Sequence, residues 1–359
     1  MPKIPLVDVK AQYAPLIEEL RSRFDAVLES GRFIKGPNFH AFEEEAAEYL
    51  GVRSAIGVAN GTDALVLVLD AMDVGPGDEV ICPAFTFYAT AESIARRGAT
   101  PVFADIDAAT LNLDADDVAR RITERTKAIM PVHLFGRPAP VAAIAQLGVP
   151  VLEDAAQAFG SPGIATSRVS TFSFFPTKNL FCLGDGGLVA VNDDELGDRV
   201  RMLAFHGSRD KRDFQLVGYN SRLDELQAAF LRLFLLHLDD WTHGRREAAA
   251  RYEELGLGEL VELPADEPAH VYHLFVCRSP ERDAIVAALA EAEVGTATYY
   301  TTPLHLQPAL LGLGWEPGSL PETERAAQEN FSIPLWPGIE PDVQERVVDV
   351  VRSAVGVRV

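Results

Sequence analysis

Cysteine is scarce in this chain of 359 residues, and its three copies, Cys82, Cys182 and Cys277, lie far apart. No C-x-x-C pair occurs, so neither a disulfide framework nor a zinc site with the usual spacing is expected. Few and scattered thiols suit a reducing compartment. We therefore expect a cytoplasmic protein that binds no structural metal.

Long apolar runs are also lacking. Charged residues interrupt the hydrophobic stretches well before the ~18 residues that suggest a membrane span, and we expect no signal peptide at the start. Positive charge is in deficit, with 32 Lys and Arg against 53 Asp and Glu and a net charge of −21. Because such a chain repels phosphate backbones, we expect no nucleic acid as a partner. The lack of a long apolar run leads us to expect no membrane as a partner. A local cluster of donors can still bind a small anion.

The remaining composition, 48% hydrophobic and 24% charged, is typical of a globular protein. Short runs rich in Val, Ile and Phe alternate with longer segments of helical spacing, which favours an α/β fold whose central sheet is mostly parallel and sandwiched by helices. The predicted strands are 55–60, 79–83, 101–106, 128–133, 150–154, 171–175 and 187–191.

The two ends of the chain lack the regular alternation of strands and helices that the middle part shows. Apolar residues recur at helical spacing over 11–31, where Gly31 can close the helix, and again in a long helical region from about 221. Strands and helices are mixed after about 245. We therefore predict a large domain over 1–240, with an N-terminal helical segment, and a smaller C-terminal α+β domain over 241–359.

The segment ANGTDAL follows a predicted strand. Gly61 permits a close backbone approach and Thr62 begins a helix, whose free N–H groups and positive dipole end suit a phosphate. Asp63 would repel a phosphate through its carboxylate, so we expect its backbone N–H to face the ligand. The alternative interpretation is an ordinary helix cap at Thr62.

A second candidate functional segment is EDAAQ, where Asp154 ends an apolar strand. A partly buried aspartate stays ionised only beside a cation or several donors, and a protonated pyridine nitrogen is such a cation. Gln157, one helical turn further, can offer its amide to a phenolate oxygen. A helix cap at Asp154 is the alternative.

The third segment, TFSFFPTKNLFCLGDGG, places Lys178 among apolar and aromatic residues, with Ser173 upstream on the strand. Desolvation favours the neutral amine of such a lysine and makes it nucleophilic toward an aldehyde. The alternative is a lysine that keeps its charged end in water.

The three segments together supply what pyridoxal phosphate requires: a phosphate site, a counter-ion for the ring nitrogen and a lysine that forms an imine. Phe87, in CPAFTFYAT, follows another strand end. It is predicted to stack on the cofactor ring, with a place in the core as the alternative.

In this order, ANGTDAL, GDEVICPAFTFYATA, EDAAQAFG, FSFFPTKNL with GDGG, GYNSRLDELQAAFL and PLHLQPAL span nearly the whole chain. The set resembles the DegT/DnrJ/EryC1/StrS family of sugar aminotransferases, which have the fold of type I pyridoxal phosphate transferases. The resemblance implies that Lys178 forms the imine, Asp154 pairs with the pyridine nitrogen and Gln157 lies near the ring hydroxyl.

The same resemblance implies that Gly61, Thr62 and Ser173 hold the phosphate and that Phe87 stacks on the ring. Asn220 would reach the cofactor phosphate of a neighbouring subunit, so a homodimer with sites at the interface is implied. Arg222, Tyr299, Tyr300 and His305 are substrate contacts by position or, alternatively, structural residues near an interface.

The implied reaction transfers an amino group from L-glutamate to a keto group of a dTDP- or UDP-linked deoxysugar. Related dehydratases carry histidine at the lysine position, so Lys178 favours transamination. Gln157 resembles the branch that aminates C-3. C-4 amination, a keto-cyclitol substrate and a non-catalytic regulatory dimer remain alternatives. The segments between Asp154 and Ser173 and before the strand at 150–154 look shorter than usual for the family, which affects the shape expected near the sugar.

Overall fold

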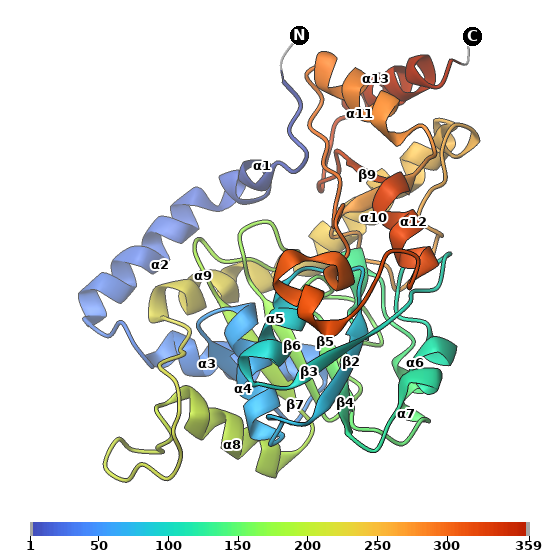
Figure 1. Cartoon of the computed structure of the whole chain (residues 1–359). Coiled ribbons are helices and arrows are strands. Elements are labelled where there is room, and N and C mark those ends of the chain that lie inside the picture. Colours follow the sequence, from blue (N-terminus) through green and yellow to red (C-terminus); the bar gives the residue numbers. More distant parts are fainter. Residues whose placement is uncertain (1–2, 357–359) are drawn as a thin grey trace.

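The computed structural model describes residues 3–356, and its largest feature is a β-sheet built in two parts (Figure 1). One part has the strand order β1-β7-β6-β5 and the other the order β3-β2-β4. The parts join where the chain beyond β4 pairs with β5: the N–H of His133 donates to the carbonyl of Asp154 at 3.0 Å. The strands are β1 Ser54–Val58, β2 Glu79–Pro83, β3 Thr100–Ala104, β4 Thr126–Ile129, β5 Leu152–Asp154, β6 Val169–Ser173 and β7 Gly187–Val191.

Strand direction confirms the predicted mostly parallel sheet. β2 pairs in parallel with β3 and β4, and β5 pairs in parallel with β6. Only β7 runs against its neighbours, β1 and β6. All predicted strands occur, with ends shifted by a few residues. Since parallel strands end at one edge, the residues that follow β1, β2, β4, β5 and β6 lie together.

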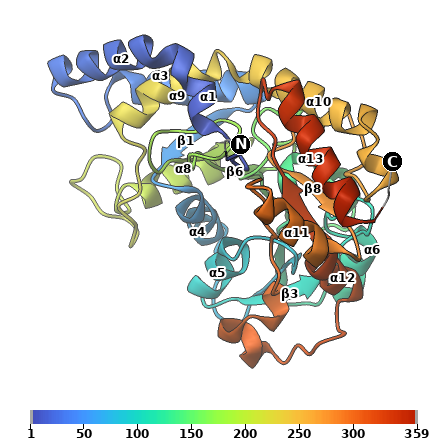
Figure 2. The same cartoon turned by 90° about the horizontal axis from the view of Figure 1, so that it is seen from above.

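Helices cover both faces of this sheet, and side chains along each strand alternate between them. In β1, Ile56 and Val58 pack in the core beneath α4, α5 and α8, whereas Ala55 faces the core formed with α3 and α9. Figure 2 shows α2, α3 and α9 on the side away from α4 and α5. The helices of this part are α1 Val9–Tyr13, α2 Ile17–Ser30, α3 Pro37–Leu50, α4 Gly61–Ala71, α5 Ala89–Arg96, α6 Ala115–Arg121, α7 Val141–Ala145, α8 Asp194–Ala204 and α9 Glu225–Leu235.

A smaller α+β unit follows, at the top of Figure 1. Its antiparallel pair, β8 (Phe275–Arg278) and β9 (Asn330–Ile333), shares a core with α10, α11 and α13. Ile4 packs in this core and bridges to Val294. The predicted division at 240 and 241 stays a prediction, because α10 runs across it. The helices are α10 Leu238–Glu254, α11 Arg282–Glu291, α12 Pro321–Glu329 and α13 Pro341–Ala354.

The helical predictions were right at Gly31, which ends α2 in a left-handed conformation (φ 63°). The long helical region after 221 was wrong as one element. It breaks into α9 and α10, because the N–H groups of Leu236 and His237 turn back to carbonyls three residues earlier. Leu236, at the end of the apolar spacing that predicted one helix, is 74% exposed at this break.

No helix between residues 3 and 356 is long and apolar enough to cross a membrane. Within the same residues, no group of three or more His, Cys, Asp or Glu side chains is arranged to hold a metal ion.

Candidate active site

A cavity of about 700 Å³ opens where the parallel strands end. This volume suits a cofactor or small ligand. We call it the main cavity. Five strand ends contribute to its lining, in the order β1, β2, β4, β5 and β6: Asn60, Phe87, Val132, Asp154 and Ser173. The C-terminal unit closes the other side with His273, Leu274, Thr298, Tyr299 and Tyr300.

The start of α4 forms one wall of the main cavity. Gly61 and Thr62 begin the helix, so their N–H groups have no partner within it and carry the positive end of its dipole. A Cβ on Gly61 would lie 2.7 Å from the Cβ of Ser173, so only glycine lets these two residues approach. An anion placed here meets backbone donors and the Ser173 hydroxyl together.

Two details of this wall differ from the prediction. The helix cap is Asn60 rather than Thr62: the Asn60 side chain accepts from the N–H of Asp63 at 2.8 Å. The expectation that the Asp63 N–H faces a ligand was therefore wrong. Asn60 precedes the helix with extended backbone, which is the geometry a cap requires.

Asp154 lies at the end of β5 and is 5% exposed. Its carboxylate accepts hydrogen bonds from the Thr90 hydroxyl at 3.0 Å and the Ala156 N–H at 3.2 Å. Burial raises the pKa of Asp154, while these donors and the charge of Lys178 oppose the rise. Two donors are few for a buried carboxylate. A cationic group in the main cavity would therefore stabilise its charge.

Gln157 does not lie one helical turn from Asp154, as predicted, because turns rather than a helix follow β5. Its amide oxygen accepts from the N–H of Phe135 at 2.8 Å, and its amide nitrogen donates to the hydroxyl of Tyr300 at 3.1 Å. Tyr300 has a left-handed backbone (φ 53°), which is unusual for a tyrosine. The Gln157 amide is thus fixed at the wall of the main cavity.

Lys178 follows β6 in a turn and lines the same cavity. Burial lowers the pKa of its amine to about 8, although the charge of Asp154 acts in the opposite direction. Its sequence neighbours Phe174, Leu180 and Phe181 are fully buried in the core formed with α3 and α9, whereas Phe175 is 50% exposed and lines the same cavity as Lys178. A lysine with this pKa is partly neutral near pH 7 and can act as a nucleophile.

Phe87 is 60% exposed and lines the main cavity, which places it in the open rather than in the core. Tyr299 and Tyr300 also line the cavity. Neither Asn220 nor Arg222 does: both follow α8 in the segment that leads to α9, and Asn220 is exposed. The predicted contact of Asn220 with the cofactor of a neighbouring subunit and the predicted substrate contact of Arg222 stay predictions.

His305 lies outside the main cavity, fully buried beside Phe103 and Trp315. Its Nε2 pairs with the carboxylate of Glu324 at 3.1 Å. This environment matches the structural alternative and offers the substrate role no support.

Several residues that line the main cavity were not predicted from the sequence. Thr90 lies three residues after Phe87, in the first turn of α5, and its contact with Asp154 crosses from one strand end to another. Asp185 belongs to the GDGG motif but was not itself predicted as a site residue. His273 and Thr298 come from the C-terminal unit, where no local motif marked them.

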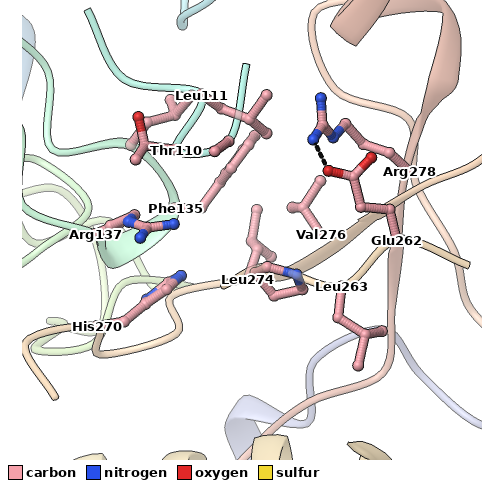
Figure 3. A pocket seen from close by; sticks show the side chains of 13 residues that line it. Thr110, Leu111, Phe135, Arg137, Glu262, Leu263, His270, Leu274, Val276 and Arg278 are labelled. Carbon is pink, nitrogen blue, oxygen red and sulfur yellow. Dashed lines mark hydrogen bonds and ion pairs between the residues drawn. The ribbon is translucent and has the colours of Figure 1, made fainter. Parts of the chain in front are cut away.

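A second cavity lies between the large part and the C-terminal unit, with Phe135 and Arg137 on one side and Leu274 and Arg278 on the other (Figure 3). Its volume is about 20 Å³, which is room for little more than a water molecule. It is therefore too small to hold a cofactor.

The profile of the DegT/DnrJ/EryC1/StrS aminotransferase family matches residues 15–352. The chain belongs to this family. A Geobacillus stearothermophilus protein named "Pleiotropic regulatory protein" is 46% identical over 96% of this chain and 97% of its own length. The dTDP-3-amino-3,4,6-trideoxy-alpha-D-glucose transaminase of Streptomyces venezuelae is 43% identical, with 98% and 96% covered.

Solved structures agree with this family assignment. DesV of S. venezuelae, in complex with a ketimine intermediate, superimposes with a TM-score of 0.96 at 42% identity, covering 100% of both chains. The Bacillus subtilis protein ntda with bound cofactor PMP gives 0.93 at 31% identity, covering 99% of this chain and 86% of that one. The predicted fold of type I transferases is confirmed.

The residues present fit pyridoxal phosphate. A buried carboxylate with few donors, Asp154, suits the cationic ring nitrogen, and the start of α4 with Ser173 suits the phosphate. Lys178, with its lowered pKa, lies in the same cavity and suits an aldehyde. The chain is a pyridoxal phosphate-dependent aminotransferase of the sugar-modifying family.

Proposed function

We propose that this enzyme moves an amino group from L-glutamate to the C-3 keto group of a nucleotide-linked keto-deoxysugar. One observation carries the proposal: Lys178, Asp154 and the start of α4 line a single cavity large enough for cofactor and sugar. The similar enzyme from S. venezuelae, whose name describes a 3-amino sugar, supports amination at C-3.

Lys178 performs two tasks in this proposal. Its amine would hold a bound cofactor covalently, and once an amino donor takes that place the freed amine would move a proton at the donor's α-carbon. A pKa of about 8 serves both tasks, because the amine exchanges protons readily near neutral pH. The cofactor supplies the carbonyl that accepts the amino group and a ring that takes up electrons.

Asp154 holds a proton on the ring nitrogen. Hydrogen bonds from the Thr90 hydroxyl and the Ala156 N–H hold its carboxylate in place, so the group is preorganised before a ligand binds. The α4 start and Ser173 would hold the phosphate of the cofactor, and Phe87 would pack against its ring. The position of these groups in the lining of one cavity supports the proposed roles.

The alternatives to this proposal differ in the sugar and in the carbon that is aminated. The family contains enzymes for different sugars, and the Gln157 amide favours C-3 over C-4. Assay of a panel of keto-sugar nucleotides by mass spectrometry decides the position. Product aminated only at C-4, or only a keto-cyclitol accepted, would contradict the proposal.

We also propose a homodimer whose two sites lie at the interface, in the cytoplasm, where its three free cysteines stay reduced. Several large apolar side chains at and just after α2 are exposed, which supports burial against a second copy. They are Phe24, Leu28, Phe33 and Ile34. Sedimentation velocity at micromolar concentration tests this, and a monomer would contradict it.

The covalent step has a direct test. Protein loaded with pyridoxal phosphate is reduced with borohydride, digested and mapped by mass spectrometry. We expect the label on Lys178, and Lys178→Ala should fold, bind less cofactor and show no turnover. A label on another residue would contradict the assignment.

A second candidate function is regulatory, because one relative carries the name "Pleiotropic regulatory protein". The intact Lys178 and Asp154 favour catalysis. Loaded protein whose absorbance does not change when L-glutamate is added would favour the regulatory candidate.

A further inference from the structure

One buried histidine of the main cavity has no use in the proposed reaction. His273, just before β8, lines the cavity and is 5% exposed. Its Nδ1 is enclosed and has no hydrogen-bond partner among residues 3–356. A buried polar atom without a partner costs free energy, so the fold keeps this side chain at a cost.

The charges around His273 are positive. Lys178 approaches from the cavity side and Arg245 from α10, and both, with burial, hold the pKa of His273 well below its usual range. Arg245 is itself 1% exposed, and its guanidinium donates to the carbonyl of Tyr272 and to the amide oxygen of Gln12. In the described part of the chain it has no carboxylate partner. Asp154 and Asp185 line the cavity without bonding to His273.

Among residues 3–356 no carboxylate is hydrogen-bonded to His273 or Arg245, although the charge of Asp154 acts on Lys178. A neutral imidazole between two cations presents a donor in a locally positive environment, which is the setting that a carboxylate prefers. We propose that His273 binds the carboxylate of the amino donor, as a specificity-determining residue of the reaction proposed above, on which this inference rests.

The structures of the two substrates indicate which of their anionic groups can reach His273. An amino donor must bring its α-carbon beside Lys178, and its carboxylate is one bond away from that carbon. The diphosphate of a nucleotide sugar is attached several bonds from the keto carbon, so it lies further from Lys178. A carboxylate is thus the anion that reaches His273.

The chain offers a matched control three residues earlier. His270 is also buried, but its Nδ1 accepts from the N–H of Tyr272 at 3.0 Å and its ring stacks on Tyr272 at 4.0 Å. It lines the small second cavity, near Arg137 (Figure 3), and not the main cavity. His270→Gln keeps an acceptor for Tyr272 and leaves the donor site untouched.

The test measures binding of glutarate, a dicarboxylate without the amino group, to the loaded enzyme by calorimetry. Loss of one charge-assisted hydrogen bond predicts roughly a tenfold weaker affinity or more in His273→Leu. His273→Gln, which keeps a donor, should recover part of the affinity. His270→Gln should match the wild type, and none of the three should change the affinity for the nucleotide.

Unchanged glutarate affinity in His273→Leu would overturn the inference, as would no glutarate binding by the wild type. If His273→Leu does not fold, His273→Phe removes the nitrogen atoms and keeps the ring. Failure of the proposed function is separate, because it appears in the wild type as absent cofactor binding or absent amino transfer, whereas glutarate calorimetry does not need turnover.

Discussion

Burial raises the pKa of Asp154, and its two donors, the Thr90 hydroxyl and the Ala156 N–H, only partly offset that rise. Asparagine at this position has nearly the same shape but cannot hold a proton on a ring nitrogen. We expect Asp154→Asn to slow the half-reaction with L-glutamate by roughly a hundredfold or more, measured by stopped-flow absorbance.

A graded control is Thr90→Val, which removes one donor and leaves the carboxylate. Its half-reaction should slow by a smaller factor than that of Asp154→Asn. If both variants react at the wild-type rate, another group serves the ring nitrogen and the role of Asp154 is wrong.

Lys178 offers a second prediction at the residue scale. In cofactor-free protein, its reaction with an amine reagent should rise with pH around a midpoint near 8, below the ~10.4 of an ordinary lysine. Because the charge of Asp154 raises the pKa of this amine, Asp154→Asn should move the midpoint to lower pH. Labelling followed by peptide mass spectrometry measures both midpoints, and a midpoint near 10 would contradict the buried environment.

The chemical residues of the site could be predicted from the sequence because each lies at a strand end or a helix start. Lys178, Asp154, Gly61 and Phe87 all line the main cavity. His273 could not be predicted in the same way. It reaches the cavity only through the packing of the C-terminal unit, and no local pattern encodes such a contact.

At the scale of elements, α3 depends on a cap from a distant helix. The buried carboxylate of Glu225, in α9, accepts from the N–H groups of Asn38 and Phe39 at 2.7 and 3.0 Å. It thereby satisfies the free donors at the start of α3. We expect Glu225→Ala to lower the free energy of unfolding by about 2 kcal/mol, measured by urea denaturation.

The control for this cap is Glu253→Ala, at an exposed position in the last turn of α10. Its stability should stay within about 0.5 kcal/mol of the wild type. Equal losses in the two variants would show that α3 does not need the cap.

The elements also show where sequence patterns stop being informative. The strands were predictable because they are short, apolar and bounded. The break between α9 and α10 was not, since it contains neither proline nor glycine and the apolar spacing continues across it. The prediction of a helical turn after Asp154 was wrong for a related reason. The residues AAQA have high helix propensity, but the contacts of Gln157 with Phe135 and Tyr300 determine the backbone conformation.

For the molecule as a whole, His270 links stability to pH. It lies in the segment that docks the C-terminal unit on the large part, where the N–H of Val271 donates to the carbonyl of Gly136. Burial lowers the pKa of His270 from 6.5 to about 3. Between these values the unfolded chain takes up a proton that the folded chain does not, so stability falls as pH drops below 6.5 and is unaffected above it.

At pH 5 this effect amounts to about 2 kcal/mol. Urea unfolding at pH 7.5 and pH 5.0 should therefore show a smaller loss of stability in His270→Gln than in the wild type, by about that amount. The same loss in both proteins would mean that other groups control the acid sensitivity.

The last prediction concerns two copies of the chain. Asn220 lies outside the main cavity of its own subunit and is exposed, so its predicted role requires a partner. We combine two inactive variants, Lys178→Ala and Asn220→Asp, by refolding them together. In a mixed dimer with shared sites, one site contains both lesions and the other contains none. About a quarter of the wild-type activity should return in an equal mixture, since half of the dimers are mixed and each has one intact site. If Asn220 instead served its own subunit, every site would carry one lesion and the mixture would stay inactive.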